Sequence, residues 1–409
     1  MSVVALKERK QLSADALFHL VRSGFANIPD PRGEDVDISL TDTLMSAFAM
    51  FSLKAPSLLA FAKERAEGNV HTSYGMQHGP CDTDRRERLD PVSPGWLRPL
   101  CTSVLRQLQR GKALEAMQFF DGHYFLALDG TEYFSSQTLP CAACLHRVHR
   151  NGSIPYTPQM WGAALIHPDQ RAVIPLVPEP MMHRDGTDKN DGERNAAKRL
   201  VAKLRPDHPP LKCIVPADSL SAHAPHIETL HAYALHYLLG VKEGEHAYLF
   251  QQGQAAEHAG RVSSDERHDR AARVVHRFRF VNQGPLNAAK ADVRVNVIAY
   301  WEIGQTKGQH CSGVTDLRVS QRNVYQLMRG RRARWKIANE TCNTLQNQGY
   351  HFEHNDGHGE PHLSVVFAML MRLACLVDQA QQLCGALFQA VWAKLGSKRR
   401  LWERRRALF

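Results

Sequence analysis

The pattern of apolar and polar residues predicts helices in the first part of the chain. Over residues 12–21 and 39–51, apolar residues recur at helical spacing. Ser13 directly precedes the first of these helices and is a typical N-cap residue. A further amphipathic stretch covers residues 96–117. We therefore predict a helical N-terminal domain over residues 1–118, and such a basic helical module suits recognition of DNA ends.

From residue 119 onward, short apolar runs alternate with amphipathic segments, which is typical of an α/β layer. One amphipathic stretch, residues 191–204, is predicted to be a crossover helix between strands. Residues 244–316 differ, because apolar and polar positions alternate there as in antiparallel strands. The predicted core strands are residues 124–128, 160–166, 172–177, 211–215 and 237–241.

Helical periodicity returns after residue 316, over residues 322–350 and 363–395. The predicted fold class is therefore α/β: a mixed sheet with flanking helices and a β-strand insertion, preceded by the helical N-terminal domain. After that domain, the predicted divisions are the first part of the core (119–243), the β-rich insertion (244–316), a core helix (317–360), and a C-terminal helix with a basic tail (361–409).

The charge balance favours a polyanionic partner. Lys and Arg number 51 against 41 Asp and Glu, which gives a net charge of +10. The excess is concentrated at residues 329–336 and in the tail at 398–406. Nucleic acid is the partner that such a distribution favours, and for the tail two interpretations stay open, a solvated end and a phosphate contact.

The composition argues against a membrane protein and against a disulfide framework. The first residues are polar and charged, unlike a signal segment, and the longest apolar run, residues 363–377, contains Arg372 and is expected to be a buried helix. Nine scattered cysteines, an odd number, suit a reducing cytoplasm. We expect a cytoplasmic protein.

Two carboxylates stand directly after apolar runs that are predicted to be strands. Asp129 interrupts the run at 124–134 and is followed by Gly130, where we expect the backbone to bend. Asp218 ends the run that begins at residue 211. Carboxylates on neighbouring strand ends, together with a basic surface, are what two-metal phosphoryl transfer requires, because Mg²⁺ prefers carboxylate oxygens.

The order of Asp129, Asp218, the β-rich insertion and residues 334–350 resembles bacterial insertion-sequence transposases of the DDE class, in their Tyr-Arg-Glu-Lys signature group. The resemblance extends from Ser13 to the end of the chain, and residues 349–359 are a specific part of it. It implies a ribonuclease H-like core. It also implies a cut-and-join reaction, in which water cuts at the transposon end and the freed 3′-hydroxyl attacks target DNA.

The resemblance further implies the site residues and partners. Asp129 and Asp218 would hold Mg²⁺ or Mn²⁺ in a two-metal site. The partner would be double-stranded DNA, as transposon ends and target, bound by a homodimer on paired ends in the bacterial nucleoid. The residues expected to contact this DNA are Arg331, Arg332, Arg334, Trp335 and Lys336.

The third signature motif departs from the pattern. With Arg334 matched, Ala338 occupies the Glu position and Arg331 the Tyr position. Glu340 is the candidate replacement for the third catalytic carboxylate, but in a regular helix it is rotated by about 200° from Ala338. A distorted turn would be needed to bring it to the site, and Glu353 is the other candidate. The remaining departures are Leu345 and Gln346 in the Lys region, and Cys342 and Asp356 at aromatic positions.

Three functions therefore stay open: an active transposase, a transposase-derived protein that binds DNA ends without cutting them, and an unrelated metal-dependent nuclease without end preference. A structural zinc site at Cys141, Cys144 and His149 is weighed against ordinary loop thiols, because the spacing of these ligands is cramped. Four histidines between residues 351 and 362 are interpreted as a polar hinge that contacts DNA.

Overall fold

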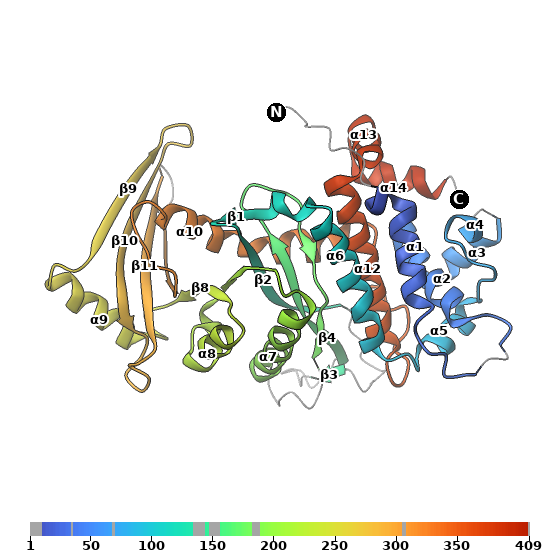
Figure 1. The fold of residues 1–409 in the computed structure, drawn as a ribbon, viewed down its shortest axis with the longest axis horizontal. Helices are drawn as coiled ribbons and strands as arrows, with labels where there is room; N and C mark the ends of the chain where they lie inside the picture. Colours follow the sequence, from blue (N-terminus) through green and yellow to red (C-terminus); the bar gives the residue numbers. More distant parts are fainter. Residues whose placement is uncertain are drawn as a thin grey trace, which may run out of the picture.

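The computed structural model describes residues 10–33, 36–67, 70–133, 144–146, 156–181, 189–304 and 308–407. The molecule is elongated, with helices at one end, a central sheet, and a β-rich part at the other end (Figure 1).

The N-terminal helices begin where the sequence predicts them. The Ser13 side chain accepts a hydrogen bond from the backbone N–H of Ala16 at 3.3 Å, which confirms the predicted N-cap. Helices continue up to Met117, and the first strand begins at Gln118. The helices are α1 Ala14–Phe25, α2 Leu40–Leu53, α3 Leu58–Glu67, α4 Val70–Ser73, α5 Asp82–Leu89 and α6 Arg98–Arg110.

Helix α12, Leu363–Cys384, joins this helical part to the sheet. It is 22 residues long, so it exceeds the predicted apolar run, and by length and composition it could cross a membrane. The whole of its apolar window is nevertheless buried inside the protein, packed against α2 and α6. Arg372 on this helix is 2% exposed, and its guanidinium lies beside Gly162 of the sheet.

The central sheet is mixed, as predicted. Strand β2 (His123–Glu132) pairs antiparallel with β4 (Tyr156–Ile166) and parallel with β7 (Cys213–Ala217), which pairs parallel with β8 (His236–Val241). The strand predicted at 172–177 is reduced to β5, Ile174–Pro175. The other short strands are β1 Gln118–Phe120, β3 Cys144–His146 and β6 Glu179–Met181.

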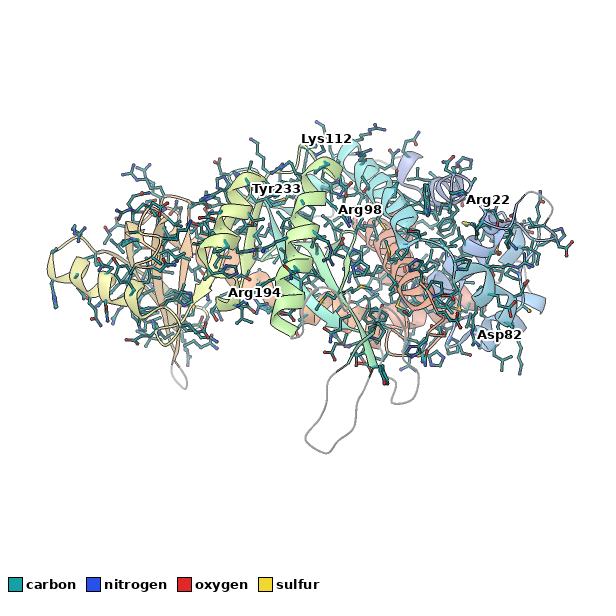
Figure 2. All side chains as sticks on the ribbon, turned by 90° about the horizontal axis from the view of Figure 1, so that it is seen from below. Arg22, Asp82, Arg98, Lys112, Arg194 and Tyr233 are labelled. Atoms are coloured by element: carbon teal, nitrogen blue, oxygen red, sulfur yellow. The ribbon has the colours of Figure 1, made fainter. Side chains whose placement is uncertain are left out.

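Helices cover both faces of this sheet. Helices α7 (Lys189–Asp207) and α8 (Ala224–Ala232) lie side by side on one face, as the view in Figure 2 shows. The opposite face is covered by α10 (Val324–Arg332). Along β2, Phe125 and Ala127 pack into the core on the α10 side, and the residues between them face the other way.

The β-rich insertion continues the central sheet. Strand β12 (Gln309–Thr315) pairs antiparallel with β8, so all these strands form one sheet of 12 strands. The insertion also begins with a helix, α9 (Ala247–His258). Its other strands are β9 Ser263–Asp269, β10 Val274–Pro285 and β11 Arg294–Ile303.

The helix predicted over 322–350 is not continuous. After α10 the chain forms a 3₁₀ turn (Ala333–Trp335), a π-helical segment (Ile337–Cys342) and the short α11 (Asn343–Asn347). Such switches of helix type often occur at functional sites.

The C-terminal segment also breaks, at Gly385 and Gly396, into α13 (Ala386–Leu395) and α14 (Lys398–Arg406). Leu401 and Trp402 of α14 are buried. The basic tail is therefore packed on the protein along one face and is not simply a solvated end.

Candidate nucleic-acid and metal site

The two predicted carboxylates lie on and directly after neighbouring parallel strands, Asp129 within β2 and Asp218 immediately after β7. Tyr124 pairs with Cys213 and Phe125 with Ile214, and continuing this register by four residues brings Asp129 level with Asp218. Alternation along each strand directs both side chains to the face that α10 covers. The fold therefore brings together two carboxylates that are far apart in the sequence.

The backbone around Asp129 differs from the expectation in one respect. Asp129 lies inside β2, which continues to Glu132, so Gly130 does not bend the strand. A Cβ atom on Gly130 would instead lie 3.0 Å from the Glu193 carboxylate of α7. The glycine therefore permits a close approach of α7 to the sheet.

One arginine lies beside the Asp129 carboxylate, and a second lies near the backbone of Asp218. The Arg334 guanidinium, on the 3₁₀ turn, lies 4.0 Å from the Asp129 carboxylate, and both side chains are about one-third exposed at 32%. Arg331 extends over the paired glycines Gly240 and Gly313, where an added Cβ would lie 2.9 Å and 3.1 Å from its side chain. Gly240 also lies next to the backbone of Asp218, so this edge of the sheet holds opposite charges in close proximity.

These residues open onto a cleft of about 890 Å³ between the sheet edge, the insertion and the 3₁₀ turn. Trp335 in this cleft is 49% exposed, although it is a large aromatic residue. Arg334 lines the cleft and contacts Asp129, so Asp129 borders the cleft at this arginine. The side chains that carry charge or hydrogen-bonding groups along the cleft are Asp218, Ser219, Lys242, Tyr300, Gln309, His310, Arg331, Arg332, Arg334 and Trp335.

Lys336 is not available to a nucleic acid, which corrects its prediction as a DNA contact. Its residue is 8% exposed, and its Nζ donates hydrogen bonds to the backbone carbonyls of His167, Pro168 and Gln170 at 2.6–2.9 Å. Burial lowers the pKa of this lysine. Lys336 instead connects the junction of the 3₁₀ turn and the π-helical segment to the loop after β4.

Arg332 has a structural partner as well as a place in the cleft. Its guanidinium pairs with Glu302 and lies 3.3 Å from the hydroxyl oxygen of Tyr300. This pair connects α10 to strand β11 and leaves Arg332 partly exposed.

The structure does not group Glu340 with the two aspartates. Successive residues are rotated about the helix axis by a larger angle in a 3₁₀ turn than in an α-helix, and by a smaller angle in a π-helix. The two distortions therefore offset each other, and Glu340 lies roughly 200° around the axis from Arg334. The negative charge of Glu340 acts on Lys336 and Lys398. Ala338 is exposed. Within the described ranges, no three His, Cys, Asp or Glu side chains gather as a metal-ligand set.

The other predicted ligands add no metal site. Cys141 and His149 lie outside the described residues, as does the side chain of Cys144, so the zinc prediction is untested. In the histidine group, His358 is only 7% exposed, whereas His354 is partly exposed and lies 3.7 Å from the Asp356 carboxylate. This group is therefore not a uniformly exposed polar hinge.

Several cleft residues were missed by sequence reasoning. Gly240 and Gly313 face each other on paired strands, and their lack of side chains creates the space in which Arg331 lies. Lys242, directly after β8, and His310, on β12, line the cleft from the same two strands as these glycines. The signal for the glycines was present, since a glycine inside a strand often marks a close approach.

No protein-family model matches the chain, and no curated protein matches it either. Among solved structures, the chain is similar to a cryo-EM structure of a piggyBac transposase synaptic complex with hairpin DNA, with 11% sequence identity and a TM-score of 0.41. The similarity covers 96% of this chain and 77% of that chain.

Proposed function

We propose that this chain is a transposase of the DDE type that binds double-stranded DNA in the cleft beside Asp129 and Asp218. The observation that carries the proposal is the placement of Asp129 on β2 and of Asp218 directly after the neighbouring parallel strand β7, with Arg334 beside the Asp129 carboxylate and Arg331 near the Asp218 backbone. A ribonuclease H-like core, action on transposon ends as a homodimer, and a bacterial cytoplasmic location belong to the same proposal.

The arginines and the exposed tryptophan supply the DNA contacts. Arg331 and Arg334 present guanidinium groups that match phosphate oxygens, and phosphate contacts account for most of the affinity of basic proteins for DNA. Trp335, 49% exposed in the same cleft, offers an aromatic face to a sugar or base. Together they would hold a strand with its phosphates next to the carboxylates.

The metal is Mg²⁺ or Mn²⁺, which Asp129 and Asp218 would hold through their carboxylate oxygens. The residues suit a hard cation, because both carboxylates project from one face of the sheet and Asp218 is exposed in an open cleft. When bound, the metal would activate the attacking hydroxyl and neutralise charge on the phosphate. The Arg334 guanidinium holds the Asp129 side chain in place and balances its charge.

The second candidate function is DNA binding without efficient cutting. A specific observation favours it: exposed Ala338 stands at the Glu position, and Glu340 is not grouped with the two aspartates within the described residues. Both candidates require DNA binding in the cleft and differ only in strand cleavage.

DNA binding is the test that both candidates must pass. We would measure binding of the full chain to labelled duplexes from the DNA that flanks its own gene, and to shuffled duplexes. Arg334→Ala is expected to weaken binding about tenfold, because it removes one charged phosphate contact next to the site. Absence of binding by the native chain, or native-like binding by Arg334→Ala, would refute the proposal.

A further inference from the structure

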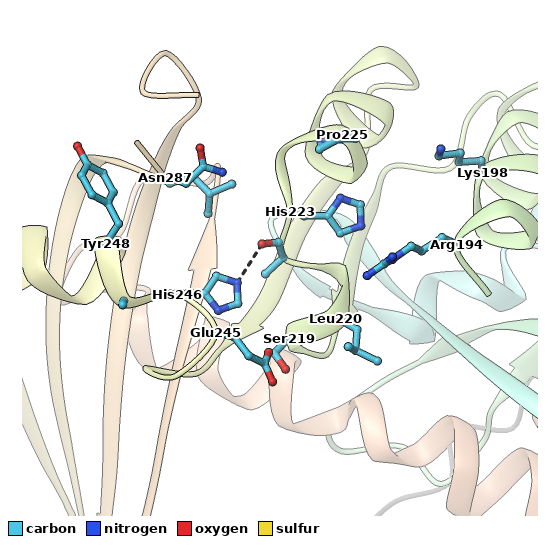
Figure 3. A pocket seen from close by; sticks show the side chains of 13 residues that line it. Arg194, Lys198, Ser219, Leu220, His223, Pro225, Glu245, His246, Tyr248 and Asn287 are labelled. Atoms are coloured by element: carbon cyan, nitrogen blue, oxygen red, sulfur yellow. Dashed lines mark hydrogen bonds between the residues drawn. The ribbon is translucent and has the colours of Figure 1, made fainter. Parts of the chain in front are cut away.

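A second hollow adjoins the cleft on the side of α7. It measures about 710 Å³ and lies between α7, the start of α8 and the start of α9 (Figure 3). Arg194 and Lys198 enter it from α7, and His223 enters from the N-cap of α8. Figure 3 shows the Arg194 side chain extending toward the turn that carries Leu220 and His223.

The hollow and the cleft share a wall. Ser219 and Leu220 line both, and they belong to the 3₁₀ turn that follows Asp218 directly. Leu220 is 44% exposed on this turn. A strand that passes Asp218 in the cleft therefore reaches the hollow by crossing a single short turn.

The hollow presents cations to whatever enters it. Arg194 and Lys198 are both exposed. Burial lowers the pKa of His223, and the positive charges of Arg194 and Lys198 lower it further, which shows that both cations act on this ring. The carboxylate that also lines the hollow, Glu245, accepts a hydrogen bond from Ser219 and pairs with Lys242 at 3.5 Å.

His223 is arranged to donate a hydrogen bond into this space. Its Nδ1 accepts from the backbone N–H of His226 at 3.3 Å, so the neutral ring carries its proton on Nε2. His246 is occupied differently, because its Nε2 lies 3.0 Å from the carbonyl oxygen of Ala222. The donors that line the hollow are thus a guanidinium, an ammonium and an imidazole N–H, which suit phosphate oxygens.

We propose that this hollow binds backbone phosphates of the DNA strand that leaves the cleft past Asp218, with Arg194, Lys198 and His223 as the contacting residues. The inference rests on the proposed function, since it extends the path of the same DNA. The contact is independent of sequence, because it reaches only phosphates.

The test compares two charge-removing double variants of the full chain by fluorescence polarisation with a labelled DNA duplex at several salt concentrations. Arg194→Ala/Lys198→Ala removes the hollow's cations. The matched control, Arg110→Ala/Lys212→Ala, removes the same charge at exposed positions at the end of α6 and at the beginning of β7, away from Asp218. The hollow variant is expected to bind about tenfold more weakly, with a salt dependence reduced by about two ions.

Each outcome decides the proposal. Lys198→Arg, which keeps the charge, is expected to bind like the native chain. If the hollow variant binds like the matched control while Arg334→Ala binds weakly, the inference is refuted and the proposed function stands. If the native chain does not bind the duplex, the proposed function fails and the inference fails with it. Thermal unfolding of every variant confirms that binding is compared between folded proteins.

Discussion

Asp378 and Asp129 both have cationic neighbours, but Asp378 is buried and Asp129 is exposed to solvent. Asp378 on α12 is buried with its side chain 4% exposed, and its carboxylate lies 2.5 Å from the Lys54 Nζ, 2.5 Å from the Tyr350 hydroxyl and 3.6 Å from Arg405. Asp129 lies 4.0 Å from Arg334 and is 32% exposed. The first carboxylate is enclosed by partners, and the second borders an open cleft.

The difference distinguishes a structural group from a ligand-binding one. Burial lowers the pKa of Lys54 to about 8, although Asp378 opposes the shift, so even this enclosed pair bears a desolvation cost. The network joins α2, the segment before α12, and α14, which explains why the basic tail packs on the protein. At the cleft the carboxylates keep access to solvent, so a cation or phosphate can approach them.

The largest expected effect follows from breaking the enclosed group. Asp378→Ala leaves the buried Lys54 and the partly buried Arg405 without their counter-charge, so we expect the free energy of unfolding to fall by about 3–5 kcal/mol. Chemical denaturation measures it. Asp82→Ala, which breaks an exposed pair with Arg86, is the control and should change the free energy by less than about 0.5 kcal/mol. Equal losses of unfolding free energy in the two variants would show that burial does not determine how strongly such an ion pair stabilises the protein.

Asp356 is a buried carboxylate with fewer partners than Asp378, and it provides a second test of the effect of burial. Burial raises the pKa of Asp356 to about 6, from an ordinary value of 3.8. The folded state therefore retains the proton up to a higher pH, and stability is lost as the pH rises from about 4 to about 6. Asp356→Asn removes this loss, so it should stabilise the protein by about 2–3 kcal/mol at neutral pH and leave its stability near pH 4 unchanged. Denaturation curves at both pH values test this, and a stabilisation that is independent of pH would contradict it.

A smaller effect is expected from filling the space under Arg331. Gly240→Ala places a Cβ atom 2.9 Å from the end of this flexible side chain, which must then shift from its position over the two glycines. We expect DNA affinity to fall about threefold while the unfolding free energy changes by less than about 1 kcal/mol. Gly244→Ala, where the added atom meets nothing within 4 Å, is the matched control. An unchanged affinity would show that the position of Arg331 does not matter for binding.

The smallest effect on stability is expected at the cleft itself. Asp129→Asn and Asp218→Asn each alter a carboxylate that keeps contact with solvent, so the unfolding free energy should change by less than about 0.5 kcal/mol. Thermal unfolding measures the change. A loss as large as that of Asp378→Ala would mean that these carboxylates are structural, and the comparison would fail.

The local part of the fold could be predicted from the sequence, and the long-range part could not. Apolar runs located β2 and β7, and the carboxylates at the ends of these runs indicated Asp129 and Asp218. The burial of Lys336 was missed because its acceptors lie near residue 168, far away in the chain. The packing of α14 was missed for the same reason, since its partner Asp378 gives no local signal. Contacts of this kind depend on tertiary packing, which periodicity does not encode.

The most direct test of the central claim is strand cleavage on a labelled duplex from the element's end with Mg²⁺ or Mn²⁺. If the cleft is a transposase site that lacks its third carboxylate, Ala338→Glu should cleave at least about 100-fold faster than the native chain, because it restores a ligand on the helix face of Arg334. Adding Asp129→Asn to that variant should abolish the gain. Absence of cleavage in both the native chain and Ala338→Glu, or cleavage that persists after Asp129→Asn, would contradict the account. Native cleavage that is lost in Glu340→Ala would instead refute the placement of Glu340 away from the site.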